Sequence, residues 1–297
     1  MANLAAQVFS VLRDTFFDVY GKPVAVQLRE KSNTQDDPFD EYIAKTLDDK
    51  LKEHKVRCQR APGPLISPDM VVYSDKPDIS ISEIGDNPDL IIGIEVKKLE
   101  RDARGSVARA SGMDYNSTPA CGRIRIYSAD DEPLEIKGFY LFACLEEVSR
   151  STYKISAMTL CDGSILNDDF DLYMQITGAR EKGINLGTYG DGANRQRPML
   201  IFSNPLGAEL LDHKTTLISG VNLGISTDSL LLTWRIIRKD VHGKEHVFYV
   251  YQDKRDVESC HVVTDQNDPF PTPKKRVSET RGRGKFKVNR RYEGLKK

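Results

Sequence analysis

Two short runs of β-branched and other apolar residues most constrain the fold of this chain. The first run spans 70–73 and the second spans 91–97, with a polar interval between them. Val and Ile suit the pleated, half-buried surface of a sheet, so both runs predict strands. If the two strands pair as a hairpin, Asp69, which comes just before the first strand, lies near the end of the second.

The second run ends in Glu95-Val96-Lys97. Side chains alternate along a strand, so Glu95 and Lys97 share one face. The opposite face points toward a core and carries Ile92, Ile94 and Val96. Mg²⁺ prefers hard oxygen ligands, so two carboxylates, Asp69 and Glu95, suit it as metal ligands. A metal there would stabilise charge on a phosphodiester and activate bound water, and a nearby lysine would support both effects.

The same residues carry a resemblance to a known family. Pro68-Asp69 followed by Glu95-Val96-Lys97 resembles the PD-(D/E)xK signature of the restriction-endonuclease-like nucleases, and the separation of 26 residues between Asp69 and Glu95 lies within that superfamily's range. The resemblance implies a Mg²⁺-dependent nuclease in which Asp69 and Glu95 bind the metal and Lys97 supports the attacking water. An ordinary hairpin that ends in a surface salt bridge is the alternative interpretation.

A second aspartate competes with Asp69 for the role of first metal ligand. Pro77-Asp78 lies between the two runs, and a tight turn at 85–88 would set Asp78 opposite Glu95. We favour Asp69 because the run that follows it is the stronger buried strand.

A predicted helix at about 39–54 carries an acid on its apolar face. The apolar stripe, at steps of three and four, consists of Phe39, Ile43, Ala44, Leu47 and Leu51. Asp40 projects within that stripe, whereas Glu41 projects about a quarter-turn away. Because burying an unpaired carboxylate is costly, Asp40 either caps the helix N-terminus or reaches the metal site. In many nucleases of the superfamily a helix acid joins the active site, so Asp40, or alternatively Glu41, is a candidate auxiliary acid.

Two polar segments after the predicted hairpin are candidates for DNA recognition. The first contains Asn116, Ser117, Thr118 and Arg123, and the second, which is rich in glycine, contains Asn194, Arg195, Gln196 and Arg197. These side-chain types hydrogen-bond to base edges in the major groove, and loops often carry recognition. A plain surface loop is the alternative in both cases.

The composition is typical of a soluble globular protein. Hydrophobic residues make up 39% and charged residues 29%, which excludes a largely disordered chain. No apolar run approaches the ~20 residues of a membrane span, and the N-terminus lacks the features of a signal peptide. Five cysteines without paired spacing argue against a disulfide framework and a zinc site, so we expect a cytoplasmic protein.

The net charge of −1 conceals a strong asymmetry. Residues 271–297 hold eleven Lys or Arg and two Glu, a balance of +9, which leaves −10 for the remaining chain. A basic tail of this kind either lies along DNA phosphates or only improves solubility.

The order of predicted elements places the chain in the α/β class. A helix at 2–20, the helix at 39–54 and the hairpin come first, and further strands follow at 123–127, 136–147, 153–161, 199–203, 229–237 and 246–251. We expect a restriction-endonuclease-like core, that is, a mixed central β-sheet flanked by helices, with additional β structure and recognition loops. We expect a single domain at 1–270 with its catalytic core at about 36–160. The recognition loops and extra β structure would lie at about 105–125 and 183–260, and the basic tail at 271–297.

These features together predict a type II restriction endonuclease that hydrolyses double-stranded DNA at specific sites with Mg²⁺. By analogy, palindromic sites imply a homodimer, and a cognate DNA methyltransferase is expected in the same restriction-modification system. Three alternatives remain: a repair or recombination nuclease of the same fold, a DNA-binding protein without catalysis, and an interaction protein that does not bind DNA.

Overall fold

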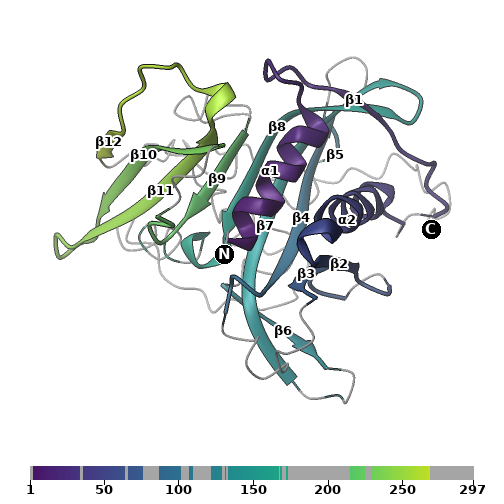
Figure 1. Ribbon diagram of the computed structural model, residues 1–297, viewed down its shortest axis with the longest axis horizontal. Helices are drawn as coiled ribbons and strands as arrows, with labels where there is room; N and C mark the ends of the chain where they lie inside the picture. The colour runs from purple at the N-terminus through teal and green to yellow at the C-terminus, as the bar shows by residue number, and fades with distance from the viewer. Residues whose placement is uncertain are drawn as a thin grey trace, which may run out of the picture.

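The fold is described by a computed structural model (Figure 1). The described residues are 3–33, 36–63, 66–75, 87–101, 107–109, 122–128, 131, 133–166, 168, 172, 215–224 and 229–267. Asp78, seven of the eight candidate DNA-contacting residues and the basic tail therefore lie outside the described residues.

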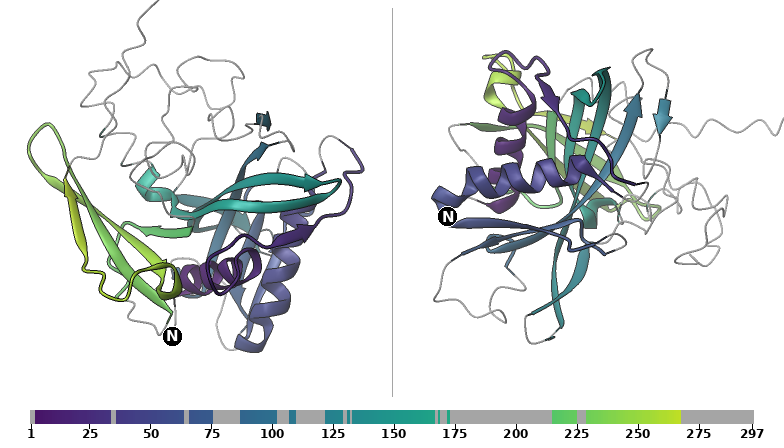
Figure 2. Two further views of the ribbon diagram at one scale, coloured as in Figure 1. Left: turned by 90° about the horizontal axis from the view of Figure 1, so that it is seen from above. Right: turned by 90° about the vertical axis from the view of Figure 1, so that its right-hand side faces the viewer.

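Helices α1 (Leu4–Phe16) and α2 (Pro38–Leu51) lie on the same side of a large sheet (Figure 2). Each begins at a side-chain cap: the Asn3 side chain accepts a hydrogen bond from the Ala6 amide, and that of Asp37 accepts from the amides at the start of α2. A short 3₁₀ turn, η1 (Lys52–His54), follows α2. The predicted helix at 39–54 is thus confirmed, whereas the first helix ends at Phe16 and is shorter than predicted.

Twelve strands in the described part of the chain form one sheet. They are β1 (Ala25–Gln27), β2 (Val56–Arg60), β3 (Met70–Ser74), β4 (Ile91–Arg101), β5 (Val107–Arg109), β6 (Arg123–Tyr127), β7 (Pro133–Ser149), β8 (Thr152–Asp162), β9 (Thr215–Ser219), β10 (Leu230–Lys239), β11 (Glu245–Asp253) and β12 (Thr264–Asn267). Neighbouring strands follow the order β12-β10-β11-β9-β8-β7-β4-β3-β2, and β1, β5 and β6 pair with β8, β4 and β7. The sheet is mixed, because β4 pairs with β7 in parallel and with β3 antiparallel. The α/β class is therefore confirmed.

The predicted pairing of the two strands is confirmed, and they run antiparallel. Met70 pairs with Ile94 and Tyr73 with Ile91. The pairing of β3 with β4 ends at Ile94, whereas the pairing of β7 with β4 continues as far as Arg101. The divergence of β3 from β4 leaves backbone groups of β4 available to side chains at this point.

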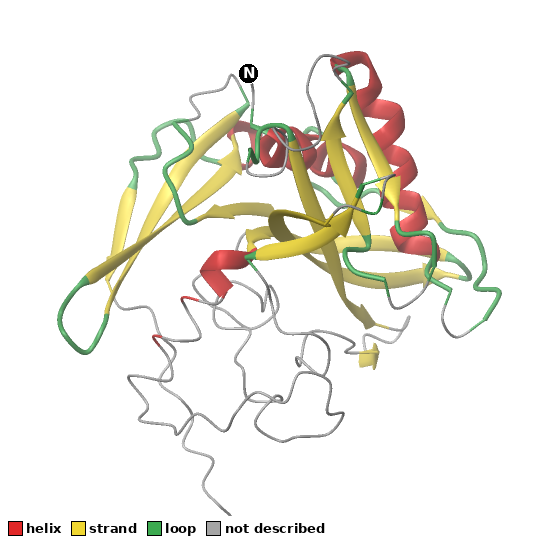
Figure 3. Ribbon diagram, turned by 90° about the horizontal axis from the view of Figure 1, so that it is seen from below, coloured by secondary structure: helices red, strands yellow, loops and turns green. Residues whose placement is uncertain are grey.

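Two apolar layers cover the central strands. On the helical side, side chains of α1 and α2 pack against Ile92, Ile94, Val96 and Leu141. On the opposite side, Tyr140 and Phe142 of β7 pack with residues of β9, β10 and β11. Figure 3 shows β10 and β11 turned away from the central strands, as expected for a large twisted sheet. No helix in the described part of the chain is long and apolar enough to cross a membrane.

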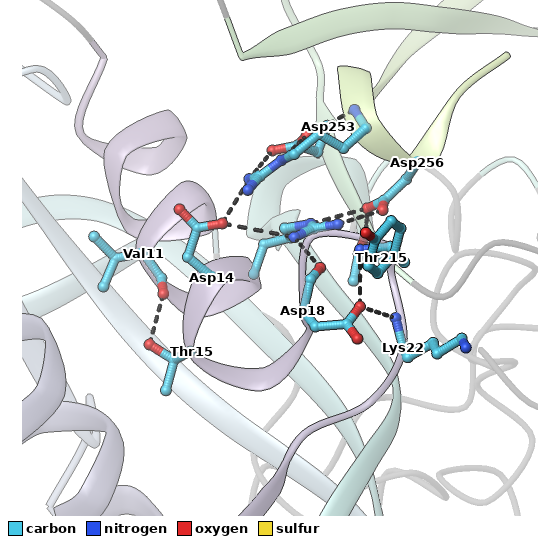
Figure 4. A network of polar contacts seen from close by, with 11 residues as sticks. Val11, Asp14, Thr15, Asp18, Lys22, Thr215, Asp253 and Asp256 are labelled. Carbon is cyan, nitrogen blue, oxygen red and sulfur yellow. Dashed lines mark hydrogen bonds and ion pairs between the residues drawn. The ribbon is translucent and has the colours of Figure 1, made fainter.

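A buried arginine fastens α1 to the far end of the sheet (Figure 4). Arg13 Nε and Nη2 donate to the two carboxylate oxygens of Asp256 at 3.1 and 2.5 Å, and Nη1 donates to the Asp18 carbonyl at 2.7 Å. Asp256 belongs to the 3₁₀ turn η4 (Lys254–Asp256), and it also accepts from Thr215 Oγ1 of β9 at 2.9 Å. These contacts connect the N-terminal helix to two elements more than 190 residues later in the chain.

Candidate active site

The candidate site lies where β3 diverges from β4. Asp69 comes one residue before β3, and its Oδ2 accepts a hydrogen bond from the Val96 amide at 2.7 Å. The carboxylate thus bonds to β4 just beyond the last β3–β4 pair, and its position is set by the main chain of both strands. The predicted closeness of Asp69 to the end of the second strand is confirmed.

Glu95 and Lys97 lie beside Asp69. Glu95 is buried, and its Oε1 accepts from Ser67 Oγ at 2.5 Å. Its Oε2 lies 3.9 Å from Lys97 Nζ, as expected for neighbours on one face of a strand. Ser67 is exposed and Asp69 is half-buried, so the site reaches the protein surface on this side.

The electrostatics of the site favour the binding of a cation. Burial, and then the negative charge of Glu95, raise the pKa of Asp69 above its ordinary value. The Val96 amide and Lys97 lower the pKa but only partly offset these effects. Two carboxylates held this close repel one another. Binding of a proton or a metal ion relieves this repulsion and stabilises the folded protein.

Asp40 belongs to the same charge cluster. It is buried on the helical side of β4, and its Oδ1 lies 3.3 Å from Lys98 Nζ. Burial, and then the charge of Asp69, raise the pKa of Asp40, whereas the charges of Arg60 and Lys97 lower it. Capping of α2 is carried out by Asp37, whose Oδ1 accepts from the amides of Phe39 and Asp40. Of the two explanations for an inward acid, proximity to the site is the one that fits Asp40.

Glu41 points away from the cluster, as the quarter-turn offset indicates. Its Oε2 accepts from Arg29 Nε at 2.9 Å and Nη2 at 2.5 Å, and it lies 3.3 Å from Arg60 Nη1. Its side chain is 46% exposed. Glu41 is thus engaged by arginines at the surface.

Sequence reasoning missed two polar contacts of the site. Ser67 holds Glu95, and Lys98 contacts both Asp37 and Asp40 from the core-facing side of β4. The alternation of Ile92, Ile94 and Val96 continues to Lys98, so the sequence does place a cation on the face toward the core. That position was a signal that a buried acid must lie opposite it.

The remaining predicted residues are not brought to this site in the described structure. Arg123 is exposed at the start of β6, where it pairs with Lys137 of β7. Asp78, Asn116, Ser117, Thr118, Asn194, Arg195, Gln196 and Arg197 lie outside the described residues.

The donor set fits a hard divalent cation. Across the described ranges, no group of three or more His, Cys, Asp and Glu side chains is placed to hold a metal ion. Mg²⁺ commonly uses only one or two carboxylates and fills its remaining positions with water and substrate phosphate. Asp69 and Glu95 provide such a pair at a site that reaches the surface.

No protein-family model, no curated protein and no solved structure matches this chain.

Proposed function

We propose that this protein is a Mg²⁺-dependent endonuclease that hydrolyses phosphodiester bonds in double-stranded DNA, and that it acts as a type II restriction endonuclease. One observation carries the proposal: Asp69, Glu95 and Lys97 meet at the divergence of two strands, in the residue pattern of the PD-(D/E)xK nucleases. An ordinary surface hairpin gives no reason to bury Glu95 and to raise the pKa of Asp69 beside it.

Each side chain has a role that follows from its position. Asp69 and Glu95 would hold the metal ion, which when bound would stabilise charge on the phosphodiester and lower the pKa of a bound water. Ser67 fixes Glu95 Oε1 through its hydroxyl, so the carboxylate keeps one orientation. Lys97 Nζ lies 3.9 Å from Glu95 Oε2, and it would orient the attacking water and stabilise the developing negative charge. Asp40 adds a third carboxyl group from the helical side, and burial raises its pKa to about 8.

Sequence specificity, a homodimeric state and a partner methyltransferase complete the proposal by analogy with restriction endonucleases. A repair or recombination nuclease of the same superfamily would share the chemistry and differ in its products. Cleavage at one short site gives discrete fragments, whereas a nuclease without site specificity gives a smear.

The proposal is tested by incubating bacteriophage DNA with the purified protein and Mg²⁺. We expect discrete fragments from the wild type, no fragments when the metal is chelated, and a loss of cleavage of at least about 100-fold in Lys97→Ala. Lys239→Ala is a suitable control, because Lys239 is 59% exposed on β10 and pairs only with a surface glutamate among the described residues. No cleavage by the wild type, over a range of divalent metals and DNAs, would overturn the proposal, and DNA binding without cleavage would favour a non-catalytic DNA-binding protein.

A further inference from the structure

Arg60 lies at the same end of the sheet as the candidate site. It is the last residue of β2 and pairs with Met70 of β3, next to Asp69. The amide of Ala61, the following residue, donates to the Asp69 carbonyl at 2.9 Å. Three adjacent strands, β2, β3 and β4, therefore present Arg60, Asp69 and the pair of Glu95 and Lys97 at one end.

The contacts of Arg60 with described residues are long. Its Nη1 lies 3.3 Å from Glu41 Oε2, and its Nη2 donates to the Asp37 carbonyl at 3.2 Å. The side chain is 35% exposed. Since a guanidinium carries five N–H donors in a rigid fork, these contacts leave it with capacity for a further acceptor.

Glu41 does not depend on Arg60 for charge compensation. Arg29 binds the same Glu41 oxygen through two shorter contacts, at 2.9 and 2.5 Å, and also binds Asp36. Arg29 is thus the principal partner of Glu41, and Arg60 lies at the edge of this cluster. If Arg60 turned away, Glu41 Oε2 would keep both of its contacts with Arg29.

The positive charge of Arg60 acts electrostatically on the buried carboxyl group of Asp40. Burial raises the pKa of Asp40, and the positive charge of Arg60 is among the effects that lower it. Asp69 and Glu95 lie beside the place where a phosphodiester would bind in the proposed nuclease, so an anionic substrate needs nearby cations. Lys97 provides one on β4, and Arg60 provides another on β2.

We propose that Arg60 is a substrate-binding residue that exchanges its Glu41 contact for a backbone phosphate of the bound DNA, next to the bond that is cut. The proposal deepens the nuclease assignment and rests on it. The planar guanidinium matches two phosphate oxygens, which a lysine cannot do in the same way. Glu41 holds the arginine in place until the phosphate arrives.

The experiment compares Arg60→Gln with Arg57→Gln, a matched control. Arg57 also lies on β2, and its side chain is 38% exposed. It makes a bidentate contact, at 2.8 and 3.0 Å, with Asp48 of α2, the helix that carries Glu41. DNA binding is measured by fluorescence anisotropy with Mg²⁺ over a series of KCl concentrations. Both variants carry Lys97→Ala so that the DNA stays intact.

Loss of one phosphate contact has a defined signature. All values are compared with those of the Lys97→Ala protein. We expect Arg60→Gln to weaken binding about tenfold and to reduce the slope of log K against log salt by about 0.9. We expect Arg57→Gln to leave both the affinity and the slope unchanged. Arg60→Lys should keep most of the slope but weaken binding about threefold, because charge remains while the fork is lost. This second variant also serves if Arg60→Gln fails to fold.

The outcomes separate this inference from the nuclease assignment. If the wild type cuts DNA and Arg60→Gln and Arg60→Lys bind it as Arg57→Gln does, Arg60 does not contact substrate and only this inference is overturned. If the wild type neither cuts nor binds DNA, both are overturned.

Discussion

Two clusters of charged residues, at Arg13 and at Asp69, are built on opposite principles. Arg13 is fully buried, and all three of its guanidinium nitrogens donate to oxygens of Asp256 and Asp18. Around Asp69 the neighbouring groups include Glu95 and Asp40, so charges of the same sign lie close together. The first cluster pairs each guanidinium nitrogen with an oxygen, whereas the second holds carboxyl groups together whose repulsion Lys97 and Arg60 offset only in part.

The contrast separates a stabilising network from a ligand site. Removal of one partner from a buried ion pair with good geometry and complete hydrogen bonding greatly lowers the stability of the folded protein, because the other charge stays buried without compensation. Repelling carboxylates, in contrast, lower the stability of the folded protein, and such groups cluster at functional sites. Substitutions in the two clusters should therefore change stability in opposite directions.

The largest effect is expected at Arg13. Arg13→Leu leaves the Asp256 carboxylate without its bidentate partner and separates α1 from η4, so the free energy of unfolding should fall by about 3–5 kcal/mol. Arg235→Leu is the control, because Arg235 makes an equally bidentate pair with Asp265 but is 46% exposed. That control should lose no more than about 1 kcal/mol. Denaturant unfolding measures both, and equal losses would remove the basis for treating Arg13 as a structural anchor.

The second effect has the opposite sign. Asp69→Asn keeps an oxygen for the Val96 amide but removes the charge that faces Glu95. We expect the variant to be more stable than the wild type by about 1–3 kcal/mol at neutral pH without divalent metal, and to lose DNA cleavage. Thermal unfolding in a chelator measures the gain. A variant less stable than the wild type would contradict the idea that these carboxylates repel.

The gain should also depend on pH in a defined direction. Because the pKa of Asp69 is raised on folding, the folded protein binds this proton more tightly than the unfolded chain does. The contribution of Asp69 to stability is therefore greatest below its ordinary pKa of 3.8 and is lost as the pH rises through the folded-state pKa. The advantage of Asp69→Asn should be small near pH 4 and should grow toward neutral pH.

The smallest effects distinguish two adjacent acids of α2. Asp40→Asn removes a buried ionisable carboxyl group beside the site and should lower the cleavage rate about 10–100-fold. Glu41→Gln changes a surface residue held by Arg29, and cleavage should stay within about twofold of the wild type. Single-turnover cleavage of one plasmid substrate compares them. The reverse order would show that Glu41, not Asp40, is the auxiliary acid.

Local pattern was sufficient to predict the central elements. The strands expected at 70–73 and 91–97 are β3 and β4, and the acid on the apolar face of α2 is indeed buried. Asp69, Glu95 and Lys97 could be placed together because they lie on two strands adjacent in the sequence, where alternation fixes which side chains share a face.

Features that depend on packing between distant elements were missed. The strand β2 was not predicted because Arg57 and Arg60 interrupt its apolar residues, yet Val56 packs beneath α2 and Cys58 against the same core. The predicted second strand stopped at Lys97, but β4 continues to Arg101 because β7 pairs with it and Asp37 and Asp40 neutralise Lys98. No local sequence signal identifies these partners, since they come from another helix and another strand.

The most direct test of the central claim measures the response of the carboxylate pair to Mg²⁺. Thermal unfolding of the wild type and of Asp69→Asn is followed at neutral pH while Mg²⁺ is titrated without DNA. A ligand at ten times its Kd stabilises a protein by about 1.4 kcal/mol, so we predict a Tm that rises with the logarithm of the Mg²⁺ concentration above Kd for the wild type and does not rise for Asp69→Asn. An equal rise in both proteins, or no rise in the wild type, would contradict a metal site at Asp69 and Glu95.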